Sequence, residues 1–480
     1  MSQRHSCFFL FGYYKEKYVF VYLLFWEINV SLSSNCVKLV YYEPYIIEIF
    51  MYRTKIKELI EWKLSSMRKP LIFLGARQVG KTYLLREFGK TEYKQTAYIN
   101  FERPGAPKNL FEVDFDADRI ITVLNAYCNM KIDAENTLII FDEIQAAPKG
   151  VTSLKYLFED VPQYHIIAAG SLLGVGIHPD ESFPVGKVDF MKLYPMSFHE
   201  FLLAMDEAGI AELLEKKDLT SLNYFNKKLI NYLRYYLYVG GMPEAVTDFA
   251  ENRDWQNVRK IQNQIVTAYR HDFSKHAPKE ILPRINMVWE SIPAQLSKEN
   301  KKFVYGVIKE GSRAKDFEMA IQWLTDAGLL HKIYNTSKAS LPLVAYKDLS
   351  AFKLFHNDVG LLGAMSQLNA KTIAEGNAIF TEYKGALTEQ YVFQQMILNE
   401  DLSIYYHTFG NSKYELDFII QNKSDEIIPI EVKSGENLRS NSFRLFCQNY
   451  NPKKAIRTSL VDYKEESWMT NIPLYAVNSI

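Results

Sequence analysis

Cysteine is scarce in this sequence, which excludes proteins built on disulfides or on thiolate-bound metals. The four cysteines among 480 residues are Cys7, Cys36, Cys128 and Cys447, and no two of them form a Cys-x-x-Cys pair. A chain of this length has enough apolar residues to fold without a disulfide scaffold. We therefore expect a cytoplasmic protein that works in a reducing compartment.

Net charge and long hydrophobic runs are also missing. Lys and Arg together number 56, as do Asp and Glu, so no overall field attracts nucleic acid or a membrane surface. No apolar run reaches the roughly 18–20 residues that a membrane span needs. The nine histidines form no His-Glu-x-x-His pair. A nucleic-acid site would have to be a local patch, and membrane insertion is not expected.

The first fifty residues differ from the sequence that follows them. Aromatic residues crowd 8–11 and 18–26, whereas an amphipathic helical pattern begins at Met51. We interpret residues 1–50 as an upstream extension, translated from a misassigned start codon and not part of the fold. The alternative is a genuine extension that lacks a fixed structure or touches a membrane.

Residues 75–82 carry the clearest chemical signal in the chain. They read Gly-Ala-Arg-Gln-Val-Gly-Lys-Thr and lie between a strand-like run at 71–74 and a helical run at 83–88, the setting of a phosphate-binding loop. In such a loop the backbone N–H groups and the helix N-terminus face phosphate oxygens. Lys81 should neutralise the β- and γ-phosphates of ATP, and Thr82 should ligate Mg²⁺. The predicted nucleotide-binding residues of the loop are Gly75, Ala76, Arg77, Gln78, Val79, Gly80, Lys81 and Thr82.

An acidic strand end supplies the second half of the predicted site. Residues 138–141 are fully apolar and are followed by Asp142 and Glu143. We expect Asp142 to bind Mg²⁺ and Glu143 to deprotonate the attacking water. Ser171 follows the next strand, where its side chain would either contact the γ-phosphate or cap a helix. No arginine finger can be named, and Arg77 is expected at the edge of the loop.

The distribution of strands and helices predicts an α/β fold with several domains. Apolar runs at 71–74, 97–101, 138–141 and 166–168 alternate with helical stretches, which indicates a parallel sheet covered on both faces. The predicted segments are the 1–50 extension, an ATPase core at 51–196, a helical lid at 197–275, a winged-helix-like segment at 276–375 and a C-terminal domain at 376–480.

The C-terminal domain contains a second group of charged residues. Glu389 lies on a predicted helix, Asp417 on a strand, and Glu431 and Lys433 on the next strand. Residues two apart on a strand share a face, so Glu389, Asp417 and Glu431 could bind Mg²⁺ while Lys433 positions a water. The alternative is a half-exposed strand whose charges face solvent.

A modest basic patch accompanies the winged-helix-like segment. It consists of Lys298, Lys301, Lys302, Lys309, Arg313 and Lys315, and it is diluted by Glu299, Glu310 and Asp316. The patch suits phosphate contacts with DNA. A purely structural packing role is the alternative.

Taken together, the motifs resemble those of bacterial and archaeal AAA-type ATPases that end in a domain of unknown function with a restriction-nuclease-like fold. The motifs lie at residues 75–82, 141–145, 169–171, 193–202, 238–245 and 353–362. The resemblance covers about residues 51–480 and implies an AAA core, a helical lid, a winged-helix segment and a nuclease-like domain. It implies a PD-(D/E)xK site in which Asp417, Glu431 and Glu389 supply carboxylates and Lys433 orients water.

Two functions are consistent with the sequence. The first is an ATP-hydrolysing enzyme with Mg²⁺ as cofactor that acts on or near DNA through a nuclease-like tail. The second is a nucleotide-dependent switch whose tail binds a partner, either another protein or a second copy of the chain, without cutting DNA.

Overall fold

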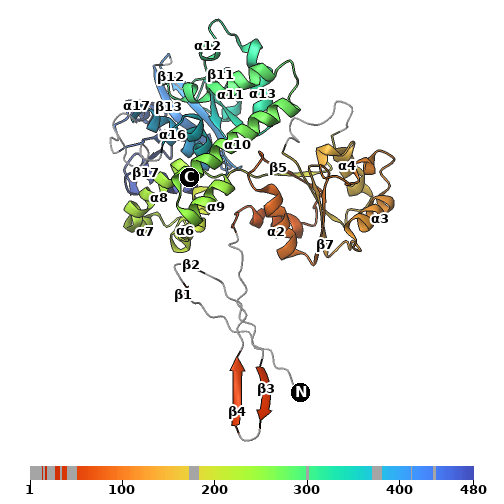
Figure 1. Cartoon of the computed structure of the whole chain (residues 1–480). Helices are drawn as coiled ribbons and strands as arrows, with labels where there is room; N and C mark the ends of the chain where they lie inside the picture. Colours follow the sequence, from red (N-terminus) through yellow and green to blue (C-terminus); the bar gives the residue numbers. More distant parts are fainter. Residues whose placement is uncertain are drawn as a thin grey trace.

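The computed structural model describes residues 51–171, 183–298, 302–369, 381–411, 413–435 and 439–480, with side chains from 383 onward in the fourth range. Nearer the N-terminus it describes only four short strands, in which β1 pairs with β2 and β3 with β4 (Figure 1). Their bounds are β1 Tyr13–Tyr14, β2 Lys17–Tyr18, β3 Glu27–Leu32 and β4 Asn35–Val40. The prediction for residues 1–50 otherwise falls outside the described residues. No helix in the described part of the chain is long and apolar enough to cross a membrane.

The first sheet has five parallel strands in the order β6-β7-β8-β5-β9. Its strands are β5 Leu71–Leu74, β6 Gln95–Asn100, β7 Thr137–Asp142, β8 His165–Ala169 and β9 Asp189–Lys192. All six residues of β7 are buried, as expected for a central strand covered on both faces. The predicted parallel sheet is confirmed.

Helices cover both faces of this sheet. Leu71 and Phe73 of β5 pack with α1 Ile56–Leu64 and α2 Lys81–Glu92, whereas Ile72 between them faces the opposite core. That second core is closed by α3 Ala117–Cys128 and α4 Gly150–Asp160. The alternation along β5 therefore follows the period of two that a strand imposes.

Helices dominate the chain after β9. They are α5 Phe198–Ala204, α6 Ala208–Glu215, α7 Leu219–Leu222, α8 Asn226–Val239, α9 Pro243–Asn252 and α10 Trp255–His276. A glycine pair ends α8, and Pro243 starts α9 where its missing N–H costs nothing. A Cβ on Gly241 would lie 2.2 Å from the carbonyl oxygen of Met196, so only glycine fits there.

Three helices and a pair of strands follow. They are α11 Leu282–Leu296, α12 Tyr305–Ile308 and α13 Ala314–Asp326, then β10 Leu330–Thr336 and the antiparallel β11 Lys347–His356, with α14 Val359–Met365 after them. Short 3₁₀ turns occur at η1 Lys108–Phe111, η2 Ile144–Ala146, η3 Asn223–Phe225, η4 Leu343–Tyr346 and η6 Leu474–Ser479.

The second sheet has eight strands in the order β11-β10-β12-β13-β14-β15-β17-β16. The strands added by the C-terminal region are β12 Ser403–Phe409, β13 Tyr414–Gln421, β14 Ile427–Val432, β15 Ile456–Ser459, β16 Lys464–Glu465 and β17 Thr470–Pro473, with helices α16 Thr381–Met396 and α17 Asn441–Tyr450. Parallel pairing of β10 with β12 joins the two halves. The sheet thus crosses the boundary predicted at residues 375 and 376.

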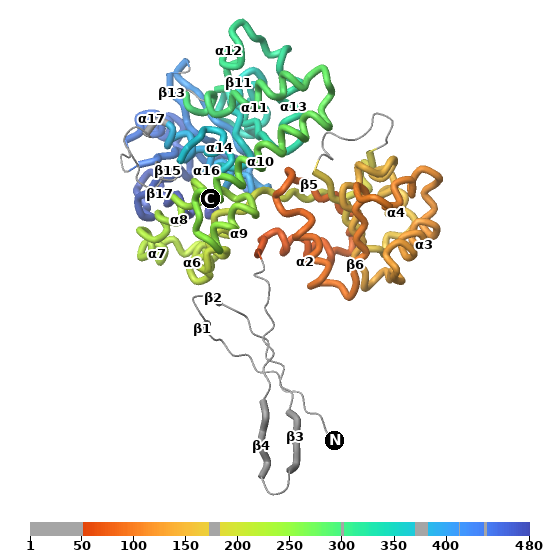
Figure 2. The backbone as a smooth tube through the Cα atoms, in the orientation of Figure 1, coloured from red at the N-terminus to blue at the C-terminus, as the bar shows by residue number. Residues whose placement is uncertain are grey.

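One continuous apolar core runs from α1 to the C-terminus. At its centre the ring of Phe198 lies 5.8 Å from that of Tyr236 and 6.2 Å from that of Tyr391, measured between centroids. Figure 2 shows the orange segment from α2 to α4 beside the green and blue remainder of the chain. The helical region and the second sheet are therefore packed together, and the first sheet lies beside them.

Candidate nucleotide-binding site and C-terminal carboxylate cluster

The loop between β5 and α2 adopts positive φ angles at its two glycines, a conformation that glycine permits. Gly75 and Gly80 have φ values of 154° and 93°, and Gln78 has φ 67°. A Cβ on Gly75 would lie 2.4 Å from the carbonyl oxygen of Leu193, so a side chain is excluded there. The turn directs the chain into α2 immediately at Lys81, at the carboxyl edge of the sheet.

Lys81 lies inside this loop. Its ammonium group donates to the carbonyl oxygens of Gly75 and Ala76 at 2.7 and 2.9 Å. Burial lowers the pKa of Lys81 to about 8, although the nearby carboxylates of Glu143 and Asp142 act in the opposite direction. Lys81 is thus held close to the two acidic residues predicted to act with it.

Asp142 connects the loop to the end of β7. Thr82 Oγ1 donates to Asp142 Oδ2 at 3.0 Å, and the hydroxyl of Tyr98 donates to the same oxygen at 2.6 Å. A threonine hydroxyl and an aspartate within contact distance fit the two protein ligands that a P-loop offers Mg²⁺. The pairing brings together two residues that the sequence predicted for one ion.

Glu143 directly follows β7 in a left-handed conformation, with φ 52°. Its Oε2 atom accepts from Gln145 Nε2 at 2.6 Å and from the backbone N–H of Ser171 at 3.5 Å. The hydroxyl of Ser171 is buried without a hydrogen-bond partner among the described residues. The residues after Ser171 fall outside the described part, so its alternative role as a helix cap stays untested.

The loop is also tied to the helical region, which sequence reasoning missed. Arg77 forms an ion pair with Asp272 of α10, and the hydroxyl of Tyr269 donates to the Arg77 carbonyl at 2.8 Å. Burial raises the pKa of Asp272, and Arg77 opposes that shift. The side chain and the carbonyl group of Arg77 therefore connect the loop to α10.

Arg53 is a second missed residue. Its guanidinium group donates to the Val79 carbonyl at 2.7 Å and to the Tyr194 carbonyl at 2.6 Å, and its Nε lies 3.3 Å from Glu200 Oε1. No local sequence pattern marks Arg53, because its burial and its contacts with Val79 and Tyr194 arise only in the fold. Arg53 supports the phosphate loop from outside.

In the C-terminal region the structure brings three of the four predicted residues together, with Asp417 on β13, Glu431 on β14 and Lys433 directly after the end of β14. Phe418 of β13 pairs with Ile430 of β14, so Asp417 and Glu431 are adjacent across the antiparallel pair. The Asp417 carboxylate accepts from the N–H of Val432 at 2.8 Å, and Lys433 Nζ lies 2.7 Å from Glu431 Oε1.

The contacts of Lys353, a residue that the sequence analysis did not single out, change the interpretation of Glu389. Lys353 of β11 is completely buried, and its Nζ lies 2.6 Å from Glu415 Oε1 and 3.8 Å from Glu389 Oε2. Among the described residues no group of three His, Cys, Asp or Glu side chains is placed to hold a metal ion. The predicted metal site of Glu389, Asp417 and Glu431 is therefore not assembled, because Glu389 is directed to Lys353. Glu415 shares a strand face with Asp417, two residues away, a signal available in the sequence.

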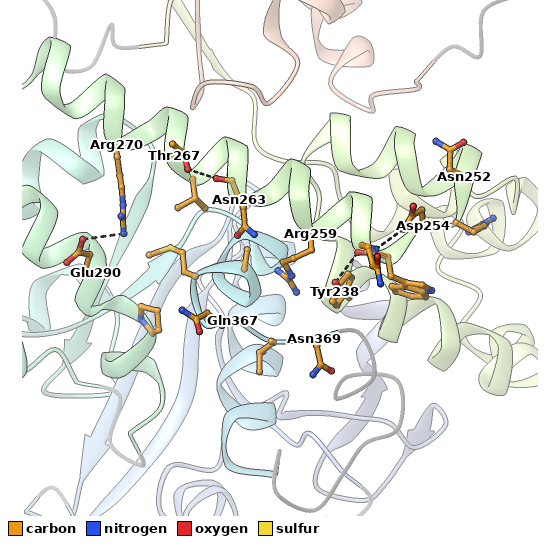
Figure 3. Close-up of a pocket in the computed structure, with 18 residues that line it drawn as sticks. Tyr238, Asn252, Asp254, Arg259, Asn263, Thr267, Arg270, Glu290, Gln367 and Asn369 are labelled. Atoms are coloured by element: carbon orange, nitrogen blue, oxygen red, sulfur yellow. Dashed lines mark hydrogen bonds and ion pairs between the residues drawn. The ribbon is translucent and has the colours of Figure 1, made fainter.

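A large groove lies along α10, away from both groups. Its volume is about 1440 Å³, and Figure 3 shows Arg259, Asn263 and Arg270 along one side of that helix. Arg259 stacks over the ring of Tyr238 at 4.3 Å, and Arg270 pairs with Glu290 at 3.3 Å. No residue lining it belongs to the phosphate loop or to the C-terminal charged residues.

Three family models match successive parts of the chain. Residues 67–202 match an AAA domain, residues 230–372 match a domain of unknown function (DUF8612), and residues 384–477 match another domain of unknown function (DUF4143). No curated protein matches the chain.

Solved structures of archaeal proteins are remotely similar. A Walker-type ATPase of Pyrococcus abyssi is 14% identical with a TM-score of 0.42, covering 66% of this chain and 96% of that one. The Orc1 protein of Aeropyrum pernix in complex with DNA is 12% identical with a TM-score of 0.26, covering 65% and 91%. A signal transduction ATPase with a tetratricopeptide repeat sensor from Pyrococcus horikoshii is 14% identical with a TM-score of 0.25, covering 74% and 46%. At these values the similarity does not extend to a shared function.

The match to the AAA domain model and the phosphate loop within it identify residues 67–202 as a P-loop ATPase domain of AAA type.

Proposed function

We propose that this protein binds ATP with Mg²⁺ and hydrolyses it at the loop formed by residues 75–82. The observation that carries the proposal is the contact of Thr82 Oγ1 with Asp142 Oδ2 at 3.0 Å, because it unites the loop with the acidic end of β7. Mg²⁺ would be held by these two side chains and would supply charge neutralisation at the phosphates.

Lys81 and Glu143 then bind the phosphates and activate the attacking water. Lys81 binds the phosphates, since its ammonium group lies inside the loop and its hydrogen bonds to Gly75 and Ala76 are exchangeable for phosphate oxygens. Glu143 accepts the proton of the attacking water, and Gln145 fixes the orientation of its carboxylate. Turnover of ATP by the purified full chain, lost in Glu143→Gln, tests this assignment.

We further propose that the protein acts on or near DNA. Three helices followed by an antiparallel strand pair, from α11 to β11, have the order of a winged helix, which supports this segment as the DNA contact. Three residues of the basic patch, Lys309, Arg313 and Lys315, are exposed around the start of α13. Lys301, another member of the patch, lies outside the described residues.

Addition of DNA should then raise the rate of ATP hydrolysis. Each of Lys309→Ala and Lys315→Ala should lower the salt dependence of DNA binding by about one unit of slope. Lys227→Ala, an exposed lysine on α8, is the matched control and should leave that slope unchanged. If Lys309→Ala and Lys315→Ala bind DNA with the same salt dependence as Lys227→Ala, the winged-helix segment is not the DNA contact.

For the tail, the adjacency of Asp417 and Glu431 together with Lys433 supports a nuclease-like site of the PD-(D/E)xK type. If this site cuts, the protein should nick DNA in Mg²⁺ or Mn²⁺, and Asp417→Ala should abolish cutting while ATP turnover persists. Cleavage that survives both Asp417→Ala and Lys433→Ala would come from elsewhere.

The second candidate function is a nucleotide-dependent switch whose tail binds a partner without cutting. It is favoured by the ion pair of Arg77 with Asp272, since that pair ties the phosphate loop to a helix that belongs to the same core as the C-terminal region. A protein partner or a second copy of the chain would then be the bound species. Absence of cleavage on single-stranded, double-stranded and branched DNA, with nucleotide-dependent changes in protease sensitivity, would favour this function over the first.

A further inference from the structure

The groove along α10 contains an arginine whose guanidinium group is only partly paired. Arg259 Nη1 donates to Gln262 Oε1 at 2.7 Å and to the Gly360 carbonyl oxygen at 3.2 Å. Its Nε and Nη2 atoms are buried and have no hydrogen-bond partner among the described residues. Because an N–H group that is removed from water without an acceptor is unfavourable, a ligand that brings an acceptor to this edge would gain from it.

The unpaired edge has the geometry that binds oxyanions. The N–H bonds of Nε and Nη2 run parallel on one side of a guanidinium group and can bind both oxygens of a carboxylate, or two oxygens of a phosphate, side by side. The group is held in place, since it lies 4.3 Å from the centroid of the Tyr238 ring and a Cβ on Gly363 would lie 3.6 Å from Nη2. Burial lowers the pKa of Arg259 and Tyr238 raises it, but a guanidinium group stays protonated in proteins. Arg259 is therefore a fixed cation with one free bidentate edge.

The walls of the groove suit a small organic molecule. Its volume is about 1440 Å³, and Figure 3 shows the side chain of Arg259 extending from α10 into it. Amide side chains contribute from two helical segments, Asn263 on α10 and Gln367 after α14. Apolar walls around a few polar groups are typical of ligand sites. Five half-buried apolar residues line the groove: Trp255, Val266, Pro293, Met365 and Leu368.

The charges around Arg259 favour a single anionic group over a nucleic-acid backbone. Exposed carboxylates lie on either side of it, Asp254 toward one end of the groove and Glu290 toward the other (Figure 3). Arg270 is already paired with Glu290 at 3.3 Å. A chain of phosphates along the groove would approach both carboxylates and be repelled, whereas one terminal oxyanion at Arg259 would not.

The groove is separate from the nucleotide site, although both involve α10. Arg259 and Asp272, which pairs with Arg77 of the phosphate loop, are about 20 Å apart along the helix. A ligand at Arg259 would therefore leave the phosphate loop free for ATP.

We propose that the groove along α10 binds a small organic anion. Nε and Nη2 of Arg259 hold its terminal carboxylate or phosphate group, and its apolar body lies against the half-buried walls. This site goes beyond the ATP hydrolysis and the DNA contact proposed above.

The test uses benzoate and phenyl phosphate, which offer the two kinds of oxyanion on the same ring, with benzyl alcohol as the neutral control. Saturation-transfer NMR on the full chain, with the nucleotide site filled by excess ADP and Mg²⁺, measures binding of each probe. At least one anion should bind saturably and at least about tenfold more tightly than benzyl alcohol, because only the anion can satisfy the charged edge of Arg259. The stronger of the two anions identifies the group that the site prefers. No saturable binding of either anion would overturn the proposal, and so would displacement of the bound anion by a short DNA duplex, which would assign the groove to nucleic acid.

Arg259→Gln should weaken binding of the anion at least about tenfold, and Arg259→Lys should also weaken it, since an ammonium group lacks the parallel pair of donors. Arg270→Gln is the matched control, because it removes an arginine of the same helix that is already paired, and it should leave the affinity unchanged. Equal affinity in the wild type and Arg259→Gln would place the anion elsewhere and contradict the proposal.

A second variant keeps Arg259 and its supporting contacts intact. Asn263 is exposed, lines the groove and lies one helical turn from Arg259, so the carboxylate of Asn263→Asp should compete for the guanidinium group and weaken anion binding by about threefold or more. Gln264→Glu is the matched control, because it adds the same charge at an exposed residue of α10 that does not line this groove. If the folded Asn263→Asp and Gln264→Glu chains bind the anion equally well, Arg259 does not hold it.

Discussion

Thr82 and Asp142, sixty residues apart in the chain, are joined by a hydrogen bond of 3.0 Å. Thr82 lies in the first turn of α2 and Asp142 ends β7, so the contact forms only when β5 and β7 lie in the same parallel sheet with their carboxyl ends at one edge. It therefore links the fold of the first sheet to the proposed chemistry, and the predictions for the nucleotide site follow from it.

Lys81→Ala should weaken ATP binding by about 100-fold or more, because charge-assisted hydrogen bonds to phosphate contribute about 1.5–3 kcal/mol each and Lys81 makes more than one. Isothermal titration calorimetry with ATP and Mg²⁺ measures the change. Lys90→Ala is the matched control, since Lys90 lies on the same helix with a mostly exposed side chain. Equal weakening in the two variants would indicate a general effect of charge and not a specific site.

Glu143→Gln should bind ATP with unchanged affinity but hydrolyse it about 10²–10⁴-fold more slowly, the usual loss for one positioned general base. Single-turnover kinetics separate the chemical step from binding. Gln145→Ala should give a smaller decrease, because Gln145 orients Glu143 without taking the proton. Wild-type turnover in Glu143→Gln would transfer the role of base to another group.

Much of the first sheet could be predicted from the sequence, since its strands are short apolar runs. The expected strand at 71–74 has the observed bounds of β5. In contrast, β9 reads Asp-Phe-Met-Lys with both ends charged, and it lies at the edge of the sheet where one side stays unpaired. Such a strand lacks the apolar run that identifies a central one.

Most of the contacts that define the candidate sites join residues that are far apart in the sequence. Arg77 and Asp272 are 195 residues apart, and no local periodicity relates them. Lys353 was visible as a charge in a stretch otherwise apolar from Ala351 to Phe355, but its partner Glu415 depends on how two segments share one sheet. Local patterns thus predicted the phosphate loop well and the neighbours of the carboxylates poorly.

Asp272→Ala should release α10 from the phosphate loop and speed nucleotide dissociation about three- to tenfold, in line with the ~1 kcal/mol expected for a partly exposed ion pair. Stopped-flow displacement of a fluorescent ADP analogue measures the rate. Arg270→Ala is the matched control because it removes the exposed pair with Glu290 from the same helix. If both variants release nucleotide at the wild-type rate, the pair of Arg77 with Asp272 does not restrain the loop.

ATP binding should depend on pH through Lys81. Burial lowers the pKa of its ammonium group to about 8 in the free protein, whereas bound phosphates favour the charged form and raise it. Between about pH 8 and the ordinary lysine pKa near 10.4, the free protein is therefore mostly neutral at Lys81 and the complex is charged, so binding takes up a proton and the affinity falls by up to about tenfold per pH unit. Near pH 7 and below, Lys81 is charged in both states and contributes no pH dependence.

Calorimetry in two buffers with different heats of ionisation counts the protons exchanged. We expect uptake approaching one proton at pH 9 that disappears at pH 7, after subtraction of the protons exchanged by ATP itself. Lys81→Arg should lose this uptake at pH 9, since a guanidinium group stays protonated there even where its affinity for ATP is reduced. The same proton count at pH 7 and pH 9 in the wild type, or release in place of uptake, would contradict a depressed pKa for Lys81 in the free protein.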